Sequence, residues 1–270
     1  MPRPAHRWHV APVAHPDTLR PWLRRDVVAA VYHLGDLDPR QLPHTRWWVA
    51  CAPGGTIGAV LLLYDAFDVP AVLPLGTPAA IGALLDAAPV RRARGTRSVV
   101  QVPAAARPVV AERATIEHDH PLVRMTLHRR DHVAAPRDLS RVVPLTPQDA
   151  QALRRLLVHS PDAFFTPEQL MHGRAYGVWH QGELVAAAGT HVLNPHEGVA
   201  VVGNVVTHPA WRNRGLATRC TARLVAALLE QVEQVALNVG RTNAAARRVY
   251  ARLGFRPHLE AHDLRCRWRA

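Results

Sequence analysis

Lysine is absent from the 270-residue sequence, cysteine is scarce, and long apolar runs are missing. The three cysteines, Cys51, Cys220 and Cys266, show no CxxC spacing, which argues against a disulfide framework and against a cysteine-based zinc site. No apolar run approaches the ~20 residues that cross a bilayer, and residues 1–10 do not read as a signal peptide. We therefore expect a cytoplasmic protein with reduced cysteines, no membrane partner and no metal site.

Arginine is abundant, and it gives the chain a formal net charge of +12. The charge is spread evenly, with 17 arginines against 12 acidic residues in residues 1–140, and 16 against 9 in residues 141–270. Because no basic tail or basic block interleaved with aromatics is present, nucleic-acid binding rests on charge alone. A positive field suits an anionic cofactor equally well.

The length favours two compact units, each large enough to bury its own core. Residues 134–147 carry Pro136, Pro144 and Pro147 among polar and arginine residues, which is typical of a boundary. We predict one domain over residues 1–140 and a second over residues 141–270.

The second domain has clear start signals and periodicities. Thr146 and Pro147 resemble the cap and first residue of a helix, and Thr166 with Gln169 matches a capping box. The later elements, in chain order, are a hairpin of strands 176–179 and 184–190, a strand at 198–207, a helix from 215 to 228, a strand at 235–239, a helix at 243–253, and strands at 255–258 and 262–268.

The first domain repeats this order loosely. We predict a helix at 18–34, a hairpin of strands 46–52 and 57–64, a strand at 71–75, a helix at 77–87, a strand at 98–102, a helix at 104–113 and a strand at 123–129. The repetition suggests a tandem duplication.

The most informative segment is the turn that follows strand 198–207. Gly215 and Ala217 are small residues at the point where the next helix begins. Backbone N–H groups at a helix start have no intrahelical partner, and with the helix dipole they can bind a diphosphate. A larger side chain there would hold the phosphates away from the backbone.

The pattern Arg212-x-x-Gly215-x-Ala217, preceded by Pro209 and a valine-rich strand, resembles the acyl-CoA diphosphate loop of the GNAT superfamily of N-acetyltransferases, and within it the FR47-like branch. The resemblance implies acetyl-CoA, or another acyl-CoA, as co-substrate. It implies that the pantetheine arm pairs with Val205, Val206 and Thr207, and that the loop is formed by Arg212, Asn213, Arg214, Gly215, Leu216, Ala217 and Thr218. The alternative is an ordinary strand-to-helix turn.

A second match follows at the expected distance. Asn243, Ala244 and Ala245, then Tyr250, then Leu253-Gly254-Phe255 resemble the family's motif after its next strand. The resemblance implies that Asn243 contacts the cofactor arm and that Tyr250 points at the thioester sulfur and protonates the departing thiolate. The alternatives are that Asn243 is only a helix cap and that Tyr250 is a core residue.

The sequence departs from the family pattern at the general base. Asn238 and Val201 occupy two positions where members often carry a carboxylate. His208, His191 and Glu197 are candidates to replace it, and a water chain or an acceptor amine of low pKa would dispense with a protein base.

By this resemblance the fold is α+β: tandem GNAT-like domains, each a mixed and mostly antiparallel sheet flanked by helices. The first domain is expected to be degenerate, because residues 74–78 lack the loop pattern and Pro78 lacks an N–H group. We expect it to bind no CoA and to wall the acceptor cleft. The predicted function is N-acyl transfer, in particular N-acetyl transfer, to a small-molecule amine by a monomer or homodimer. A non-catalytic CoA-sensing module and a nucleic-acid-binding protein are the alternatives.

Overall fold

The computed structural model describes residues 8–87, 96–132, 138–160, 163 and 165–269, so Pro136 of the predicted boundary lies outside the described residues. The chain forms two compact units, Met1–Val123 with Leu259–Ala270, and Arg124–His258. It passes from the first unit to the second within strand β6 (Ala114–His128) and returns within strand β12 (Arg256–Trp268). These limits differ from the predicted ranges 1–140 and 141–270, because two long strands continue from one unit into the other.

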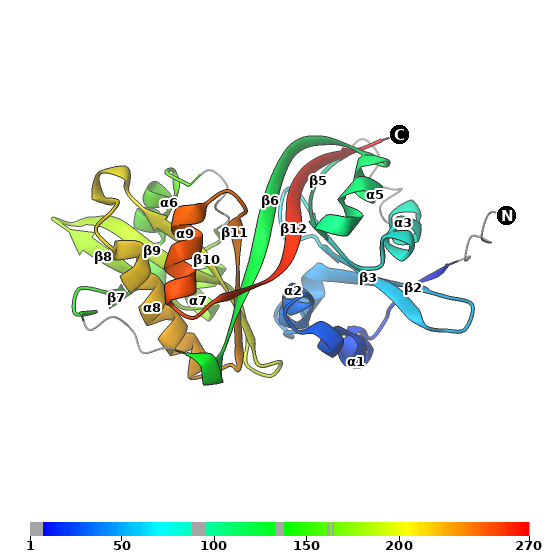
Figure 1. Cartoon of the computed structure of the whole chain (residues 1–270), viewed down its shortest axis with the longest axis horizontal. Coiled ribbons are helices and arrows are strands. Elements are labelled where there is room, and N and C mark those ends of the chain that lie inside the picture. The colour runs from blue at the N-terminus through cyan, green and yellow to red at the C-terminus, as the bar shows by residue number, and fades with distance from the viewer. Residues whose placement is uncertain (1–7, 88–95, 133–137, 161–162, 164, 270) are drawn as a thin grey trace. The chain divides into compact units, whose positions relative to one another are not determined.

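The first unit contains a sheet in the order β1-β2-β3-β4-β5-β12-β6 (Figure 1). Its remaining strands are β1 (His9–Pro12), β2 (Thr45–Cys51), β3 (Ile57–Tyr64), β4 (Ala71–Gly76) and β5 (Arg97–Pro103). β4 and β5 pair in parallel, whereas β1–β2, β2–β3, β3–β4 and β5–β12 are antiparallel. Helices α3 (Pro78–Asp86) and α5 (Arg107–Ala111) pack on this sheet, and residues of both lie in its buried apolar cluster.

The helix predicted over residues 18–34 is wrong as a single element. The structure has two short helices there, α1 (Arg20–Leu23) and α2 (Val31–Gly35), with 3₁₀ turns before and after α1. Asp26 accepts a hydrogen bond from the Ala29 N–H at 2.9 Å, and this local bond competes with continuation of the helix.

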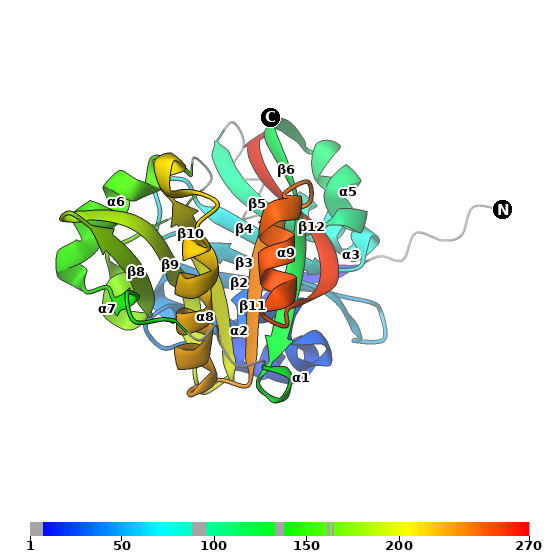
Figure 2. The ribbon, with the colours of Figure 1, turned by 60° about the vertical axis from the view of Figure 1, so that its left-hand side comes forward.

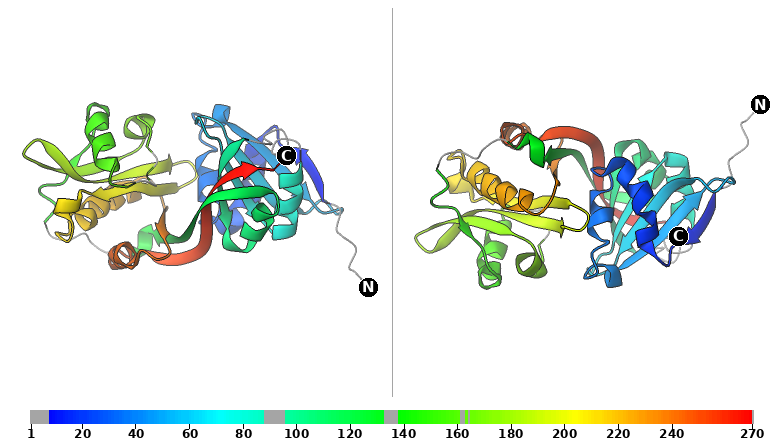
Figure 3. Two further views of the ribbon diagram at one scale, coloured as in Figure 1. Left: turned by 90° about the horizontal axis from the view of Figure 1, so that it is seen from above. Right: turned by 90° about the horizontal axis from the view of Figure 1, so that it is seen from below.

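The second unit contains strands in the order β6-β11-β10-β9-β8-β7. They are β7 (Val143–Pro144), β8 (Ala175–His180), β9 (Glu183–Asn194), β10 (Val199–Thr207) and β11 (Gln234–Gly240), together with the end of β6. Helices α6 (Ala150–Leu157) and α7 (Glu168–His172) cover one face, and α8 (Leu216–Leu229) covers the other (Figure 3). Helix α9 (Ala244–Arg252) follows β11, and in Figure 2 it lies beside α8.

Local sequence signals explain these elements. Thr146 and Asp149 form a reciprocal capping box before α6, and Gly254 adopts the left-handed φ of +94° that ends α9. Leu224 and Leu228 place the apolar face of α8 fully in the core. The predicted fold class, α+β with a mixed sheet flanked by helices, is confirmed. Within the described ranges, no helix is long and apolar enough to span a membrane.

Candidate functional site

The parallel strands β10 and β11 pair along only part of their length. Their paired residues run from Val199 opposite Gln234 to Val202 opposite Leu237, although β10 continues to Thr207 and β11 to Gly240. β9 pairs with the other edge of β10 here, so only the strand residues whose N–H and C=O groups point away from β9 keep a backbone donor and acceptor that need partners. The edge of β10 over residues 203–207 can therefore pair with an extended ligand, as an added strand would.

A β-bulge shapes this open segment of β10. The register with β9 shifts between Gly203 and Val206, and Asn204 within the bulge has a left-handed φ of +52°. The side-chain NH₂ group of Asn204 donates a hydrogen bond to Oε1 of Gln169 in α7 at 3.1 Å. Asn204 Oδ1 and Thr207 Oγ1 are buried and have no hydrogen-bond partner within the described residues. Buried polar atoms of this kind need a partner such as water or a ligand.

The turn after β10 places Gly215 at the start of α8. His208 Nδ1 accepts from the Ala210 N–H at 3.3 Å and so caps a short 3₁₀ turn, Pro209–Trp211. Gly215 is the N-cap of α8 with a φ of +73°, and a Cβ built on it would meet no atom within 4 Å. The space beside Gly215 is therefore open.

Consecutive backbone amides face this open space. The N–H groups of residues 213–218 make no hydrogen bond within the part of the chain that the structure describes, and the next amide, of Arg219, bonds to the Gly215 carbonyl. Arg212 and Arg214 are exposed in the same turn, where Arg212 Nε approaches the Thr207 carbonyl at 3.4 Å. Unpaired amides, the helix dipole and two guanidinium groups together make a site for a diphosphate.

The turn after β4 of the first unit corresponds to the turn after β10. The two turns share only the early end of pairing between their parallel strands. β4 and β5 also stop pairing early, after Val72 opposite Val100. However, the Thr77 amide is bonded to the Gly58 carbonyl, Pro78 has no amide, and a Cβ on Gly76 would overlap the backbone of Gly58. This turn therefore has neither the free amides nor the open space found around Gly215.

Tyr250 lies on α9 and is 7% exposed, with its ring 6.1 Å from that of Phe255. Burial raises the pKa of Tyr250 to about 12, because the phenolate is poorly solvated there. The hydroxyl therefore stays protonated at neutral pH and can act as a proton donor.

Asn243 is the N-cap of α9, and its side-chain oxygen accepts from the Ala246 N–H at 3.0 Å. The capping role considered from the sequence is therefore present. The side-chain NH₂ group is left for other partners, so the predicted contact with a cofactor arm stays a prediction.

Position 238 does not supply a base. Asn238 Oδ1 accepts from the Nε of Arg124, a residue of β6 that is 5% exposed. No local sequence signal indicates this pair, because its members lie 114 positions apart.

The three candidate bases lie in different surroundings. Glu197 lies in the turn before β10, and the strand from Val199 to Gly203, about 13 Å long, separates that turn from Gly203. His208 uses Nδ1 to cap its own turn. The His191 imidazole instead lies against Gly203, at the place where β10 and β11 stop pairing, and a Cβ on Gly203 would overlap the ring.

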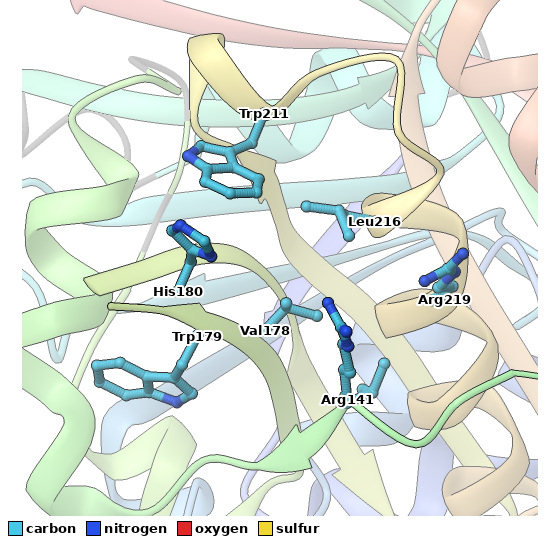
Figure 4. A pocket seen from close by; sticks show the side chains of 8 residues that line it. Arg141, Val178, Trp179, His180, Trp211, Leu216 and Arg219 are labelled. Atoms are coloured by element: carbon cyan, nitrogen blue, oxygen red, sulfur yellow. The ribbon is translucent and has the colours of Figure 1, made fainter. Parts of the chain in front are cut away.

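A hollow of about 70 Å³ borders the start of α8 on the side of β8 (Figure 4). Its polar lining includes Arg141, His180 and Arg219, and Trp179, Trp211 and Leu216 contribute apolar surface. Sequence reasoning missed this hollow, because its residues come from three separate segments.

Comparison with known families agrees with this geometry. Residues 147–255 match the family model described as the acetyltransferase (GNAT) family. This chain contains a GNAT domain. The match includes the open segment of β10, the turn around Gly215 and Tyr250, and it supports an acyltransferase. No curated protein matches the chain.

Solved structures show that the GNAT-type fold extends beyond the matched residues. A Drosophila protein with 14% identity aligns over 95% of this chain and 98% of its own, with a TM-score of 0.75. A tandem GNAT protein from the clavulanic acid biosynthesis pathway, 19% identical, covers 96% of this chain and 97% of its own, with a TM-score of 0.55. A GNAT-family protein from Novosphingobium aromaticivorans, 24% identical, covers 78% and 89%, with a TM-score of 0.58. These likenesses support tandem GNAT-like folds.

Proposed function

We propose that the protein is an N-acyltransferase that moves the acetyl group of acetyl-CoA to an amine of a small molecule. The observation that carries this proposal is the open edge of β10, which leads directly into the unpaired amides of residues 213–218. An extended amide-containing arm suits the strand edge and a diphosphate suits the amides, and coenzyme A contains both in this order.

The chain's own residues would serve the transfer as follows. A backbone N–H of residues 205–207 polarises the thioester carbonyl while the acceptor nitrogen attacks its carbon. The C–S bond breaks as the N–C bond forms. Tyr250 donates its proton to the departing sulfur and regains one from solvent.

We further propose His191 as the group that removes the proton from the attacking amine. It is favoured over Glu197 and His208 because its ring lies at Gly203, where the strand edge opens, and because His208 is occupied as a cap. The side chain at position 238 is an amide that accepts from Arg124 and cannot take up this role.

The first unit has a different part in this proposal. Its turn at Gly76 has no open space, so we assign CoA binding to the second unit alone. The number of acetyl-CoA molecules bound per chain should therefore be one.

A thiol-release assay with acetyl-CoA and a panel of primary amines tests the activity. Amine-dependent release of CoA thiol, with the acetylated amine identified by mass, is the expected result. Tight binding of acetyl-CoA without release for any amine would instead indicate the non-catalytic CoA-sensing alternative. Absence of CoA binding would contradict both.

A further inference from the structure

Asn204 places a buried amide oxygen where the open segment of β10 begins. The residue is 8% exposed, and its Oδ1 atom has no hydrogen-bond partner in the part of the chain that the structure describes. Its neighbours along the strand, Gly203 and Val205, are partly exposed. A buried carbonyl oxygen without a partner is destabilising, so Asn204 Oδ1 needs a donor such as water or a ligand N–H group.

Helix α7 fixes the orientation of the Asn204 side chain. The Thr166 N–H donates to Gln169 Oε1 at 3.3 Å, which identifies that atom as an oxygen, and the same oxygen accepts from the Asn204 NH₂ group at 3.1 Å. The NH₂ group of Asn204 therefore faces Gln169, and its oxygen faces away. The left-handed φ of +52°, which asparagine adopts more readily than most residues, holds the side chain at this position in the bulge.

Asn204 lies toward the face of the sheet opposite the diphosphate turn. Its partner Gln169 belongs to α7, whereas the unpaired amides lead into α8, and these two helices cover different faces of the sheet (Figure 3). The next residue, Val205, begins the segment whose N–H groups are proposed to polarise the thioester carbonyl. An acceptor that approaches from the α7 side therefore meets Asn204 Oδ1 beside the carbonyl carbon that it attacks.

A primary amine has the hydrogens that this position requires. When its nitrogen attacks, the N–C bond forms, the C–S bond breaks, and Tyr250 protonates the sulfur, as in the proposed function. The nitrogen gives one of its two hydrogens as a proton to the base and keeps the other as the N–H of the product amide. The retained N–H can donate to Asn204 Oδ1 throughout the transfer. Because the amide oxygen carries no charge, it favours the unreactive ammonium form less than a carboxylate would.

We propose that Asn204 is a specificity-determining residue that accepts a hydrogen bond from the retained N–H of the acceptor nitrogen, with Gln169 as its positioning residue. This inference rests on the proposed function and narrows the acceptor to a primary amine. A secondary amine has a single N–H, which it must give up as the proton, and so it leaves Asn204 Oδ1 unpaired.

Thiol-release kinetics on the full chain test this inference, with each primary amine that the wild type acetylates paired with its N-methyl derivative. The wild type should prefer the primary amine by about tenfold or more in kcat/KM. Asn204→Leu removes the oxygen and keeps about the same side-chain size, and Asn204→Gly removes the side chain and suits the positive φ. Both should lose most of this preference, raise KM for the primary amine about tenfold, and bind acetyl-CoA as the wild type does.

Two further positions provide the controls. Gln169→Met removes the anchoring oxygen and should lower the preference, whereas Gln169→Glu keeps an oxygen that accepts both bonds and should preserve it. Gln181, in the turn between β8 and β9, also has a positive φ, +47°. Gln181→Gly is therefore the matched control for the backbone change and should behave as wild type. Melting temperatures above the assay temperature show that each variant is folded.

Three results would contradict this assignment at different levels. Equal kcat/KM for primary and N-methyl amines in the wild type would overturn the inference and leave the proposed function intact. So would the wild-type preference in Asn204→Leu, because the size of the residue and not its oxygen would then select the amine. If the wild type acetylates neither class of amine, the proposed function itself fails.

Discussion

Tyr250 combines burial with a hydroxyl that must transfer a proton in the proposed reaction. Phenylalanine preserves the ring and its packing and removes only the O–H group. We predict that Tyr250→Phe lowers turnover by about 100-fold or more. Its dissociation constant for acetyl-CoA, measured by calorimetry, should stay within a factor of about two of wild type. Wild-type turnover in the variant would refute the assignment.

The raised pKa of Tyr250 also determines how stability and turnover should depend on pH. The folded pKa of about 12 lies above the ordinary tyrosine pKa of about 10. The stability gained by keeping the phenol neutral is complete below about pH 10 and is lost as the pH rises toward 12. Turnover should accordingly show no loss from Tyr250 ionisation between neutral pH and about pH 10.

Gly203 and Gly189 provide a matched pair for testing His191. An added Cβ at Gly203 would overlap the imidazole, whereas one at Gly189, its partner across β9 and β10, meets nothing nearer than 3.7 Å. We predict that Gly203→Ala and His191→Gln lower amine-dependent turnover by about 100-fold. Gly189→Ala should keep it, and all three should bind acetyl-CoA normally. Full activity in His191→Gln would remove His191 from the mechanism.

Contacts between side chains far apart in the sequence were the feature of single residues that the sequence predicted least well. Local spacing located the residues of the turn and of α9, but no local signal joined Arg124 to Asn238 or His191 to Gly203. Both contacts depend on strand register, and for His191 on the bulge at residues 203–206. The alternation of apolar and polar side chains along a strand does not predict where its register with the neighbouring strand shifts.

At the scale of elements, capping residues and apolar periodicity predicted α6, α8 and α9 well. The helix predicted at residues 18–34 was wrong, because helix propensity does not account for the local hydrogen bond at Asp26. The strands expected at 255–258 and 262–268 are one strand, β12, since the polar residues between them do not interrupt the backbone ladder.

Two substitutions of Asn243 can separate its role as the N-cap of α9 from a role in binding the cofactor. Asn243→Ala removes the cap and should lower the free energy of unfolding by about 1 kcal/mol, whereas Asn243→Ser keeps a capping oxygen and should cost little. If the side-chain NH₂ group also contacts the cofactor arm, both variants should bind acetyl-CoA more weakly. Wild-type affinity in Asn243→Ser would leave Asn243 as a cap only. Chemical denaturation and calorimetry give the two readouts.

At the scale of the whole molecule, two strands determine how the chain divides. Residues 124–128 of β6 belong to the second unit and residues 259–268 of β12 to the first. Residues 138–147, the described part of the predicted boundary, therefore lie inside the second unit, and their composition does not indicate the shared strands.

The shared strands predict that the chain cannot be separated at residue 140. If a protease site is placed at residues 138–140 and cleaved, the two fragments should elute together in size-exclusion chromatography without denaturant. Each fragment supplies a strand segment to the sheet of the other unit. Separate elution of two folded fragments would show that residues 1–140 and 141–270 are independent domains.

The central claim is that the turn at Gly215 binds the diphosphate of acetyl-CoA, and two glycines allow a direct test by calorimetry. Gly215 and Gly182 have similar left-handed φ values, +73° and +80°, and a Cβ on either would meet no protein atom within 4 Å. Alanine at either position should therefore cost a similar ~1 to 2 kcal/mol of stability. We predict that Gly215→Ala weakens acetyl-CoA binding by about tenfold or more, because its methyl group occupies the phosphate position, while Gly182→Ala binds as wild type. Equal affinity of Gly215→Ala and Gly182→Ala, or no binding by wild type, would contradict the account.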